Sequence, residues 1–119
     1  VMGAGTHGST FGGNPVVCAG GKYVLSRIDE KLLEEVAAKG EYIKSRLEGV
    51  KGVKSVSGLG LMLAIELDGK KAAGVVRESI AKGVIPLTAK DRVRLLPPLV
   101  ITMEQLARAM DVLVEVLGG

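Results

Sequence analysis

Residues 61–68 follow a period of two, and this pattern constrains the fold more than any other part of the chain. Leucine or isoleucine occupies every second position from residue 61 to residue 67, and the positions between them hold Met62, Ala64, Glu66 and Asp68. A period of two is that of a β-strand whose two faces differ. The sequence therefore predicts a strand here, and with it a sheet.

Helical patterns lie at both ends of the chain. Asn14-Pro15 predicts the start of a helix that reaches about Arg27, because asparagine caps helices well and proline fits the first helical position. Thr102-Met103-Glu104-Gln105 has the spacing of a capping box and predicts the start of the last helix. The apolar stripe of that last helix consists of Leu106, Ala109, Met110, Leu113, Val116 and Leu117.

Two further helices are expected between these ends. Asp29 is a candidate N-cap for a helix that should end at Gly49 or Lys51. Its inward face is formed by Leu32, Val36, Ile43 and Leu47. Residues 70–82 predict another helix, closed by Gly83 in the position after the C-cap. Its inward residues are expected to be Ala72, Val76 and Ile80.

The remaining segments predict short strands. Residues 53–56 have strand character, residues 57–60 suggest a bend or bulge, and residues 84–87 and 92–96 suggest two more strands, the second of them stopped by Pro97-Pro98. The predicted order is helix, helix, strand, strand, helix, strand, strand, helix. This order favours one α+β domain with a small, largely antiparallel sheet and helices packed on one side, a size that suits 119 residues.

Composition excludes several classes of function. The chain has only three aromatic residues and a formal net charge of +3, with acidic and basic residues interspersed, so nucleic-acid binding is not expected and the core should be aliphatic. No apolar run is long enough to span a membrane. The single cysteine, Cys18, cannot form an internal disulfide, which fits the cytoplasm, and its apolar neighbours predict core packing. One cysteine and one histidine, His7, make no metal site, and a structural loop role is expected for His7.

The first 15 residues are rich in glycine and contain the adjacent hydroxyl residues Ser9 and Thr10 shortly before the first helix. Glycine lets backbone amides approach an anion closely, and a helix N-terminus favours negative charge, so this segment could bind phosphate. An ordinary surface loop with a helix cap would have the same residues. The segment alone leaves both possibilities open.

Three segments together resemble a known family. They are Thr-His-Gly-Ser-Thr-Phe-Gly-Gly-Asn-Pro at residues 6–15, Val-Ser-Gly-Leu-Gly-Leu-Met-Leu-Ala-Ile-Glu-Leu at residues 56–67, and Val-Arg-Leu-Leu-Pro-Pro-Leu-Val-Ile-Thr at residues 93–102. In this order and spacing they resemble class III aminotransferases, which are fold type I pyridoxal-phosphate enzymes, and within them the acetylornithine/ornithine type. The resemblance covers essentially the whole chain.

The resemblance implies a specific role for each of three residues. Thr10 stands where the family has a hydroxyl that reaches the cofactor phosphate of the neighbouring subunit, which implies a homodimer. Ser9 stands near the substrate in acetylornithine-type members. Arg94 stands at the active site, where ornithine-type members pair an arginine with a glutamate of the large domain. The implied substrates are a small-molecule amino donor, with N-acetylornithine first, and 2-oxoglutarate, in arginine biosynthesis.

The residues around Arg94 indicate a special role for it independently of the family resemblance. Val93 and Leu95 should point to one side of a strand and Arg94 and Leu96 to the other. A buried arginine in this context would need a carboxylate partner, whereas a snorkelling or edge-strand arginine would not. Both interpretations stay open from the residues alone.

The Schiff-base lysine of the family belongs upstream of the glycine-rich segment, and no lysine of this chain matches it. We therefore expect a C-terminal portion, inactive alone, with a loop left from the large domain at residues 1–13 and the small domain at residues 14–119. Ornithine, succinylornithine and 4-aminobutyrate aminotransferases remain alternatives for the whole enzyme. A free-standing α+β ligand-binding or regulatory module, or an interaction domain, remains an alternative of another class.

Overall fold

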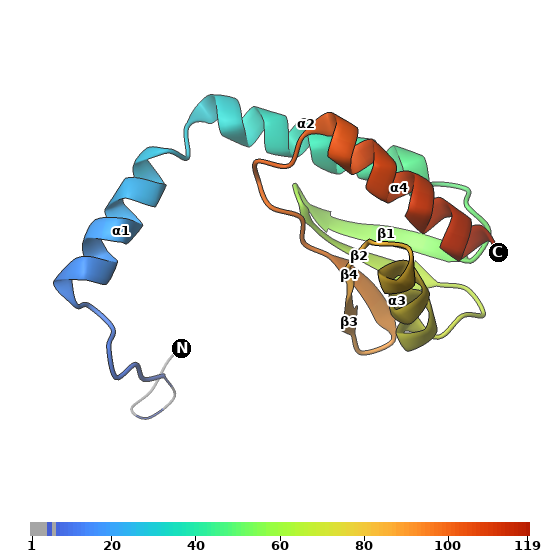
Figure 1. The fold of residues 1–119 in the computed structure, drawn as a ribbon, viewed down its shortest axis with the longest axis horizontal. Coiled ribbons are helices and arrows are strands. Elements are labelled where there is room, and N and C mark those ends of the chain that lie inside the picture. Colours follow the sequence, from blue (N-terminus) through green and yellow to red (C-terminus); the bar gives the residue numbers. More distant parts are fainter. Residues whose placement is uncertain (1–4, 6) are drawn as a thin grey trace. The chain divides into compact units, whose positions relative to one another are not determined.

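The computed structural model describes residue 5 and residues 7–119, and these residues form two compact units (Figure 1). The first unit is Val1–Lys31 and the second is Leu32–Gly119. Each unit is described by itself below. The expected loop over residues 1–13 lies partly outside the described residues.

The first unit contains helix α1, Pro15–Ser26. Asn14 is its N-cap, with its side-chain oxygen accepting a hydrogen bond from the backbone amide of Val17, and proline occupies the first turn. Both features confirm the start predicted from Asn14-Pro15. None of the residues of α1 is buried.

Helix α2, Glu30–Leu47, begins directly after Asp29, as predicted. Ile43 and Leu47 are fully buried and Val36 packs against the same core, which confirms the predicted inward face. The helix ends slightly earlier than Gly49, which adopts a positive φ of 74°. Glycine tolerates this left-handed backbone without the steric cost of a side chain, so it suits the exit from a helix.

The sheet of the second unit is built from two antiparallel hairpins. The first joins β1, Val53–Leu59, to β2, Met62–Leu67, and the second joins β3, Leu87–Ala89, to β4, Arg92–Leu95. Strands β2 and β4 then pair antiparallel, giving the order β1-β2-β4-β3. The small antiparallel sheet of the predicted α+β domain is confirmed.

Two strand boundaries differ from the prediction. Strand β1 continues through residues 57–59, where a bend was expected, because Gly58 has a φ of 129° and lets the strand approach its partner closely. A side chain at Gly58 would overlap the carbonyl oxygen of Met62. Strand β3 starts only at Leu87, since Pro86 has no amide hydrogen to donate to a ladder.

One face of the sheet forms the core. The side chains of Leu63 and Ile65 on β2 and of Val93 and Leu95 on β4 are buried, while the residues between them point away from the core. This confirms both period-two predictions. The fully buried side chains are aliphatic apart from Ser79, as the scarcity of aromatic residues suggested.

Helix α3, Ala72–Ala81, confirms the predicted inward face in part, because Ala72 is buried and Val76 packs against the core, but Ile80 does not. Ala72, Val75 and Ser79 are buried, whereas Ile80 is 49% exposed. The buried hydroxyl of Ser79 donates a hydrogen bond to the carbonyl oxygen of Val75 at 2.8 Å, which removes the cost of burying it.

The end of α3 is a Schellman motif. The amide of Gly83 donates to Ile80 and that of Val84 donates to Ser79, at 3.0 and 2.9 Å. Gly83 has a φ of 87°, which confirms the predicted role of this glycine after the C-cap Lys82. The motif turns the chain sharply from the helix toward the second hairpin.

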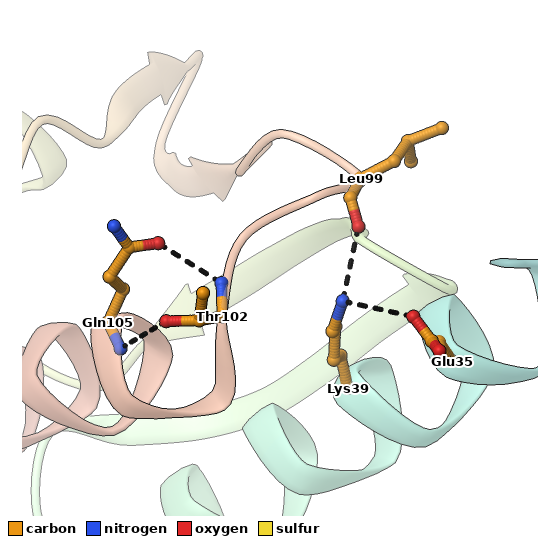
Figure 2. Close-up of polar contacts among 5 residues, drawn as sticks. All are labelled: Glu35, Lys39, Leu99, Thr102 and Gln105. Carbon is orange, nitrogen blue, oxygen red and sulfur yellow. Dashed lines mark hydrogen bonds and ion pairs between the residues drawn. The ribbon is translucent and has the colours of Figure 1, made fainter.

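Helix α4, Met103–Gly118, starts with the predicted capping box. The amide of Gln105 donates to the Thr102 hydroxyl, and the Thr102 amide donates to the side chain of Gln105 (Figure 2). Helices α2 and α4 lie side by side, joined by an ion pair of 2.6 Å between Arg46 and Asp111 (Figure 1). The predicted apolar stripe of α4 is confirmed, with five members buried and Ala109 packed against the core: Leu106, Met110, Leu113, Val116 and Leu117.

Candidate active site

The loop before α1 is fixed at its end by one asparagine. The side-chain nitrogen of Asn14 donates to the carbonyl oxygen of Phe11 at 2.6 Å, while its side-chain oxygen accepts from Val17 at 3.0 Å. The same residue thus closes the turn and caps the helix. These two hydrogen bonds hold the end of the glycine-rich loop next to the first turn of α1.

Ser9 and Thr10 are exposed in this loop. The turn is tight, because a Cβ atom on Gly12 would lie 2.9 Å from the Cβ atom of Ser9. The first turn of α1 contains no acidic residue that would repel an anion. Hydroxyl groups donate well to phosphate oxygens, and the hydroxyl of Thr10 is exposed to solvent.

Two other residues of the first unit are also exposed. His7 is exposed, and a structural loop role for it stays a prediction. Cys18 is exposed, so the prediction of core packing is wrong. The reason is physical: within this unit α1 has no second layer of structure against which to bury a face.

Arg94 lies on β4, on the sheet face that points away from the core. The register of the strands places it in a row with Ser57, Ala64 and Leu87, none of which is charged. Strand β4 lies between β2 and β3, so the edge-strand interpretation of this arginine is wrong. Its side chain is exposed and has no ion pair with any described residue.

A polar cluster on β1 and β2 escaped sequence reasoning. Lys54 donates to one carboxylate oxygen of Glu66 at 2.7 Å, and Ser55 donates to the other at 3.0 Å. These hydrogen bonds, that from Lys54 foremost, hold the pKa of Glu66 below its usual value, and the carboxylate in turn raises the pKa of Lys54. Glu66 was visible as a polar position of the alternating strand, but the β-bulge that brings Lys54 beside it has no sequence pattern.

Thr10 and Ser9 belong to one compact unit and Arg94 to the other, so the structure gives the geometry of each group by itself. Among residue 5 and residues 7–119, no group of three or more histidine, cysteine, aspartate or glutamate side chains could hold a metal ion. Within the same residues no helix is long and apolar enough to cross a membrane.

Comparison with known proteins assigns the family. The model of the class-III aminotransferase family matches residues 1–117. The chain belongs to the class-III aminotransferases, and both its α+β fold and its motifs agree with this assignment.

Individual relatives are similar over almost the whole chain. The acetylornithine aminotransferase of Haemophilus ducreyi is 47% identical over 115 residues, which is 96% of this chain. That of Corynebacterium efficiens is 45% identical over 119 residues. This chain spans only 29% and 30% of the length of these two relatives.

Solved structures show the same fold. The acetylornithine aminotransferase of Elizabethkingia anophelis matches 98% of this chain with a TM-score of 0.81 and 31% identity. The ornithine aminotransferase of Toxoplasma gondii matches the same share with a TM-score of 0.81 and 32% identity. In both cases the chain covers about a third of the solved structure, at 33% and 30%.

Proposed function

We propose that the whole protein moves the ω-amino group of N-acetylornithine to 2-oxoglutarate, as a step of arginine biosynthesis in the cytoplasm. The donor becomes an aldehyde and the 2-oxo acid becomes glutamate, so the amino group is conserved. The observation that supports this donor is the similarity to acetylornithine aminotransferases over nearly the entire chain, at 47% and 45% identity for two of them.

Pyridoxal phosphate, when bound, supplies the aldehyde that takes up the amino group and a ring that withdraws electrons from the reacting carbon. The chain's own contribution to holding it would be Thr10, whose exposed hydroxyl could donate to a phosphate oxygen. The lysine that binds the cofactor is expected in the part of the protein that precedes this chain. We propose that the isolated chain is therefore inactive.

Arg94 has the role of a carboxylate-binding residue in this proposal. Its guanidinium offers paired N–H donors that match a carboxylate, and the row of the sheet around it contains no acid that would neutralise it. Its partner is a carboxylate at the active site, of a substrate or of a glutamate from the large domain. Ser9 is proposed to lie close to the substrate, beside Thr10.

A homodimer completes the proposed site. In a two-fold dimer the loop that contains Thr10 can serve the cofactor of the neighbouring subunit, and it does so twice. The apolar side chains exposed on α1, such as Val16 and Leu25 at 81% and 70%, support contact of this helix with a further protein surface. The proposed small domain begins at residue 14, and the loop before it is proposed to belong with the large domain.

The experiment that tests the donor compares kcat/KM of the full-length enzyme for N-acetylornithine, ornithine, succinylornithine and 4-aminobutyrate. That ratio reports differences in transition-state binding. Ornithine is the second candidate, because the Toxoplasma gondii ornithine aminotransferase has the same fold at a TM-score of 0.81. A tenfold advantage of any alternative over N-acetylornithine, about 1.4 kcal/mol, would refute the proposed donor.

The alternative of a free-standing ligand-binding module makes a different prediction. Such a module should bind a small molecule tightly by itself. Calorimetric titration of the isolated chain with pyridoxal phosphate, N-acetylornithine and 2-oxoglutarate tests this, and the aminotransferase proposal expects no tight binding to it.

A further inference from the structure

Helix α1 is apolar around most of its circumference. Lys22 is its only charged residue, and Ser26 lies beside Lys22 on the helix surface. Apart from Pro15, the other positions have apolar, aromatic or small side chains, and at 3.6 residues per turn they cover an arc of about 260°. This apolar arc consists, in order around the helix, of Ala19, Tyr23, Val16, Gly20, Val24, Val17, Gly21, Leu25 and Cys18.

An arc of this width does not fit a helix that lies on the surface of a domain. A surface helix has an apolar stripe of about 100° or somewhat more, whereas a helix that is apolar all round is buried. None of the residues of α1 is buried, and the large side chains of the apolar arc are exposed by 58% to 81%. Contiguous apolar surface of this kind marks a contact with further protein.

The stability of α1 also requires a packing partner. Isolated helices of about 12 residues are marginal in water, and α1 has 12 residues. Gly20 and Gly21 lie in its middle, and only proline is less favourable than glycine inside a helix. The cap at Asn14 stabilises the first turn alone. The helix therefore depends on a surface that the described residues of its own unit, Val1–Lys31, do not supply.

The length of the relatives indicates what covers the arc. The chain spans 29% and 30% of two acetylornithine aminotransferases, so most of a protein of that length lies outside it. A second copy related by a two-fold axis presents one surface, which covers a stripe of a helix. Covering about 260° of the circumference takes protein on several sides of the helix, as in the core of a domain.

We infer that the large domain encloses the apolar arc of α1 and leaves only the strip of Lys22 and Ser26 accessible. The inference rests on the proposed large domain, the part of the protein that precedes residue 1. It makes α1 the element that anchors the small domain to the large domain. The identity of the amino donor does not enter it.

The test measures the reactivity of thiols in the full-length enzyme. In a Cys18→Ala background, Val24→Cys places a thiol opposite the polar strip, and Lys22→Cys, the matched control, places one on the strip. A buried thiol reacts only when the structure opens, so Val24→Cys should react with iodoacetamide at least about a hundredfold more slowly in the native enzyme than in urea. Lys22→Cys should react at nearly the same rate in both conditions.

Val17→Cys repeats the measurement at a second position of the arc. Peptide mass spectrometry separates these thiols from those of any other cysteine in the full-length enzyme. Equal reactivity of the arc and strip positions in the native enzyme would overturn the inference.

A photo-crosslink identifies the surface that covers the arc. Tyr23→benzoylphenylalanine exchanges one aromatic side chain of the arc for another. After irradiation, the crosslinked enzyme should keep the mass of one subunit on a denaturing gel, and peptide mapping should place the link before residue 1. A band with the mass of two subunits would point to the second copy, and a link to residues 32–119 would point to the rest of this chain. Either result would overturn the inference.

Both experiments are done without substrate, so their outcome is independent of the proposed donor. If the arc is protected but kcat/KM favours ornithine, the donor is wrong and the inference stands. If kcat/KM favours N-acetylornithine but Val24→Cys reacts freely, the donor stands and the inference fails.

Discussion

Lys39 and Leu99 are 60 residues apart in sequence, yet the ammonium group of Lys39 donates a hydrogen bond of 3.2 Å to the carbonyl oxygen of Leu99 (Figure 2). The lysine is only 7% exposed, and its nearest carboxylate, that of Glu35, is 4.0 Å away. The bond joins α2 to the loop that follows the strand of Arg94. This hydrogen bond therefore connects helix α2 to the loop next to the strand that contains Arg94.

Removal of this link should destabilise the chain. Lys39→Met keeps the apolar length of the side chain but loses the donor, and we expect the free energy of unfolding to fall by about 1 kcal/mol, the net value of one hydrogen bond. Urea denaturation of the 119-residue chain measures it. Lys44→Met, which removes the exposed pair of Lys44 with Glu41, is the control and should change stability by less than about 0.5 kcal/mol.

Helix α2 also approaches the sheet at Gly40, where there is no room for a side chain. A Cβ atom at this position would overlap the carbonyl oxygen of Gly60, in the turn between β1 and β2. Gly40→Ala should therefore destabilise the chain by about 1–3 kcal/mol, the usual cost of overpacking. The opposite sign is expected for Gly74→Ala.

Gly74 is the matched control because it too is helical but faces open space. Alanine is favoured over glycine in a helix, so Gly74→Ala should stabilise the chain by about 0.5–1 kcal/mol. Thermal or urea unfolding of both variants checks the pair. If both substitutions changed the free energy of unfolding in the same direction, the close approach of α2 to the hairpin would be contradicted.

The lowered pKa of Glu66 makes a prediction about pH. A carboxylate whose pKa is lower in the folded than in the unfolded chain contributes stability above its unfolded pKa, and this contribution is lost as the pH falls through the folded pKa. Glu66→Gln should therefore flatten the acid side of the stability profile. Carbon-13 NMR titration should show the pKa of Glu66 rising toward its ordinary value in Lys54→Met, and an unchanged pKa would count against the ion pair.

The proposed role of Thr10 predicts a loss of cofactor affinity. Thr10→Val in the full-length enzyme keeps the shape of the side chain but removes the hydroxyl, and we expect binding of pyridoxal phosphate to weaken by about 1–3 kcal/mol. Absorbance titration of the cofactor-free enzyme measures this. Thr88→Val on β3 is the control, because its register partner Val93 lies on the core side of the sheet, and cofactor affinity should be unaffected there.

The sequence predicted those parts of the fold that depend on local pattern. The number and order of the helices and strands, the cap at Asn14 and the capping box at Thr102 followed from periodicity and end signals. The inward face of α3 followed only in part: Ala72 and Val76 contact the core as predicted, but Ile80 is exposed and Val75 is buried, because both are apolar and only tertiary packing decides between them. A buried Ser79 is equally hard to foresee, since its partner is a backbone carbonyl of its own helix.

The candidate site shows the same division. Thr10, Ser9 and Arg94 were predicted from motifs and remain predictions, whereas the outward direction of Arg94 followed from the alternation on β4 and is confirmed. The pairing of β2 with β4, which sets Glu66 and Arg94 on neighbouring strands, joins segments about 30 residues apart and has no local signal. The bulge at Lys54 depends on the same pairing and was missed for that reason.

Arg94 lies on the seam where the two hairpins meet, opposite Ala64 on β2. Each hairpin is closed by contacts between neighbours in sequence, whereas the seam forms only when the segment from 68 to 86, with α3, has brought the second hairpin back to the first. Long-range pairing of this kind comes late in folding, because the loop must close before its contacts are gained. Arg94 thus takes its place on the sheet only after the two hairpins have paired. The carboxylate binding proposed for Arg94 would therefore depend on complete assembly of the domain.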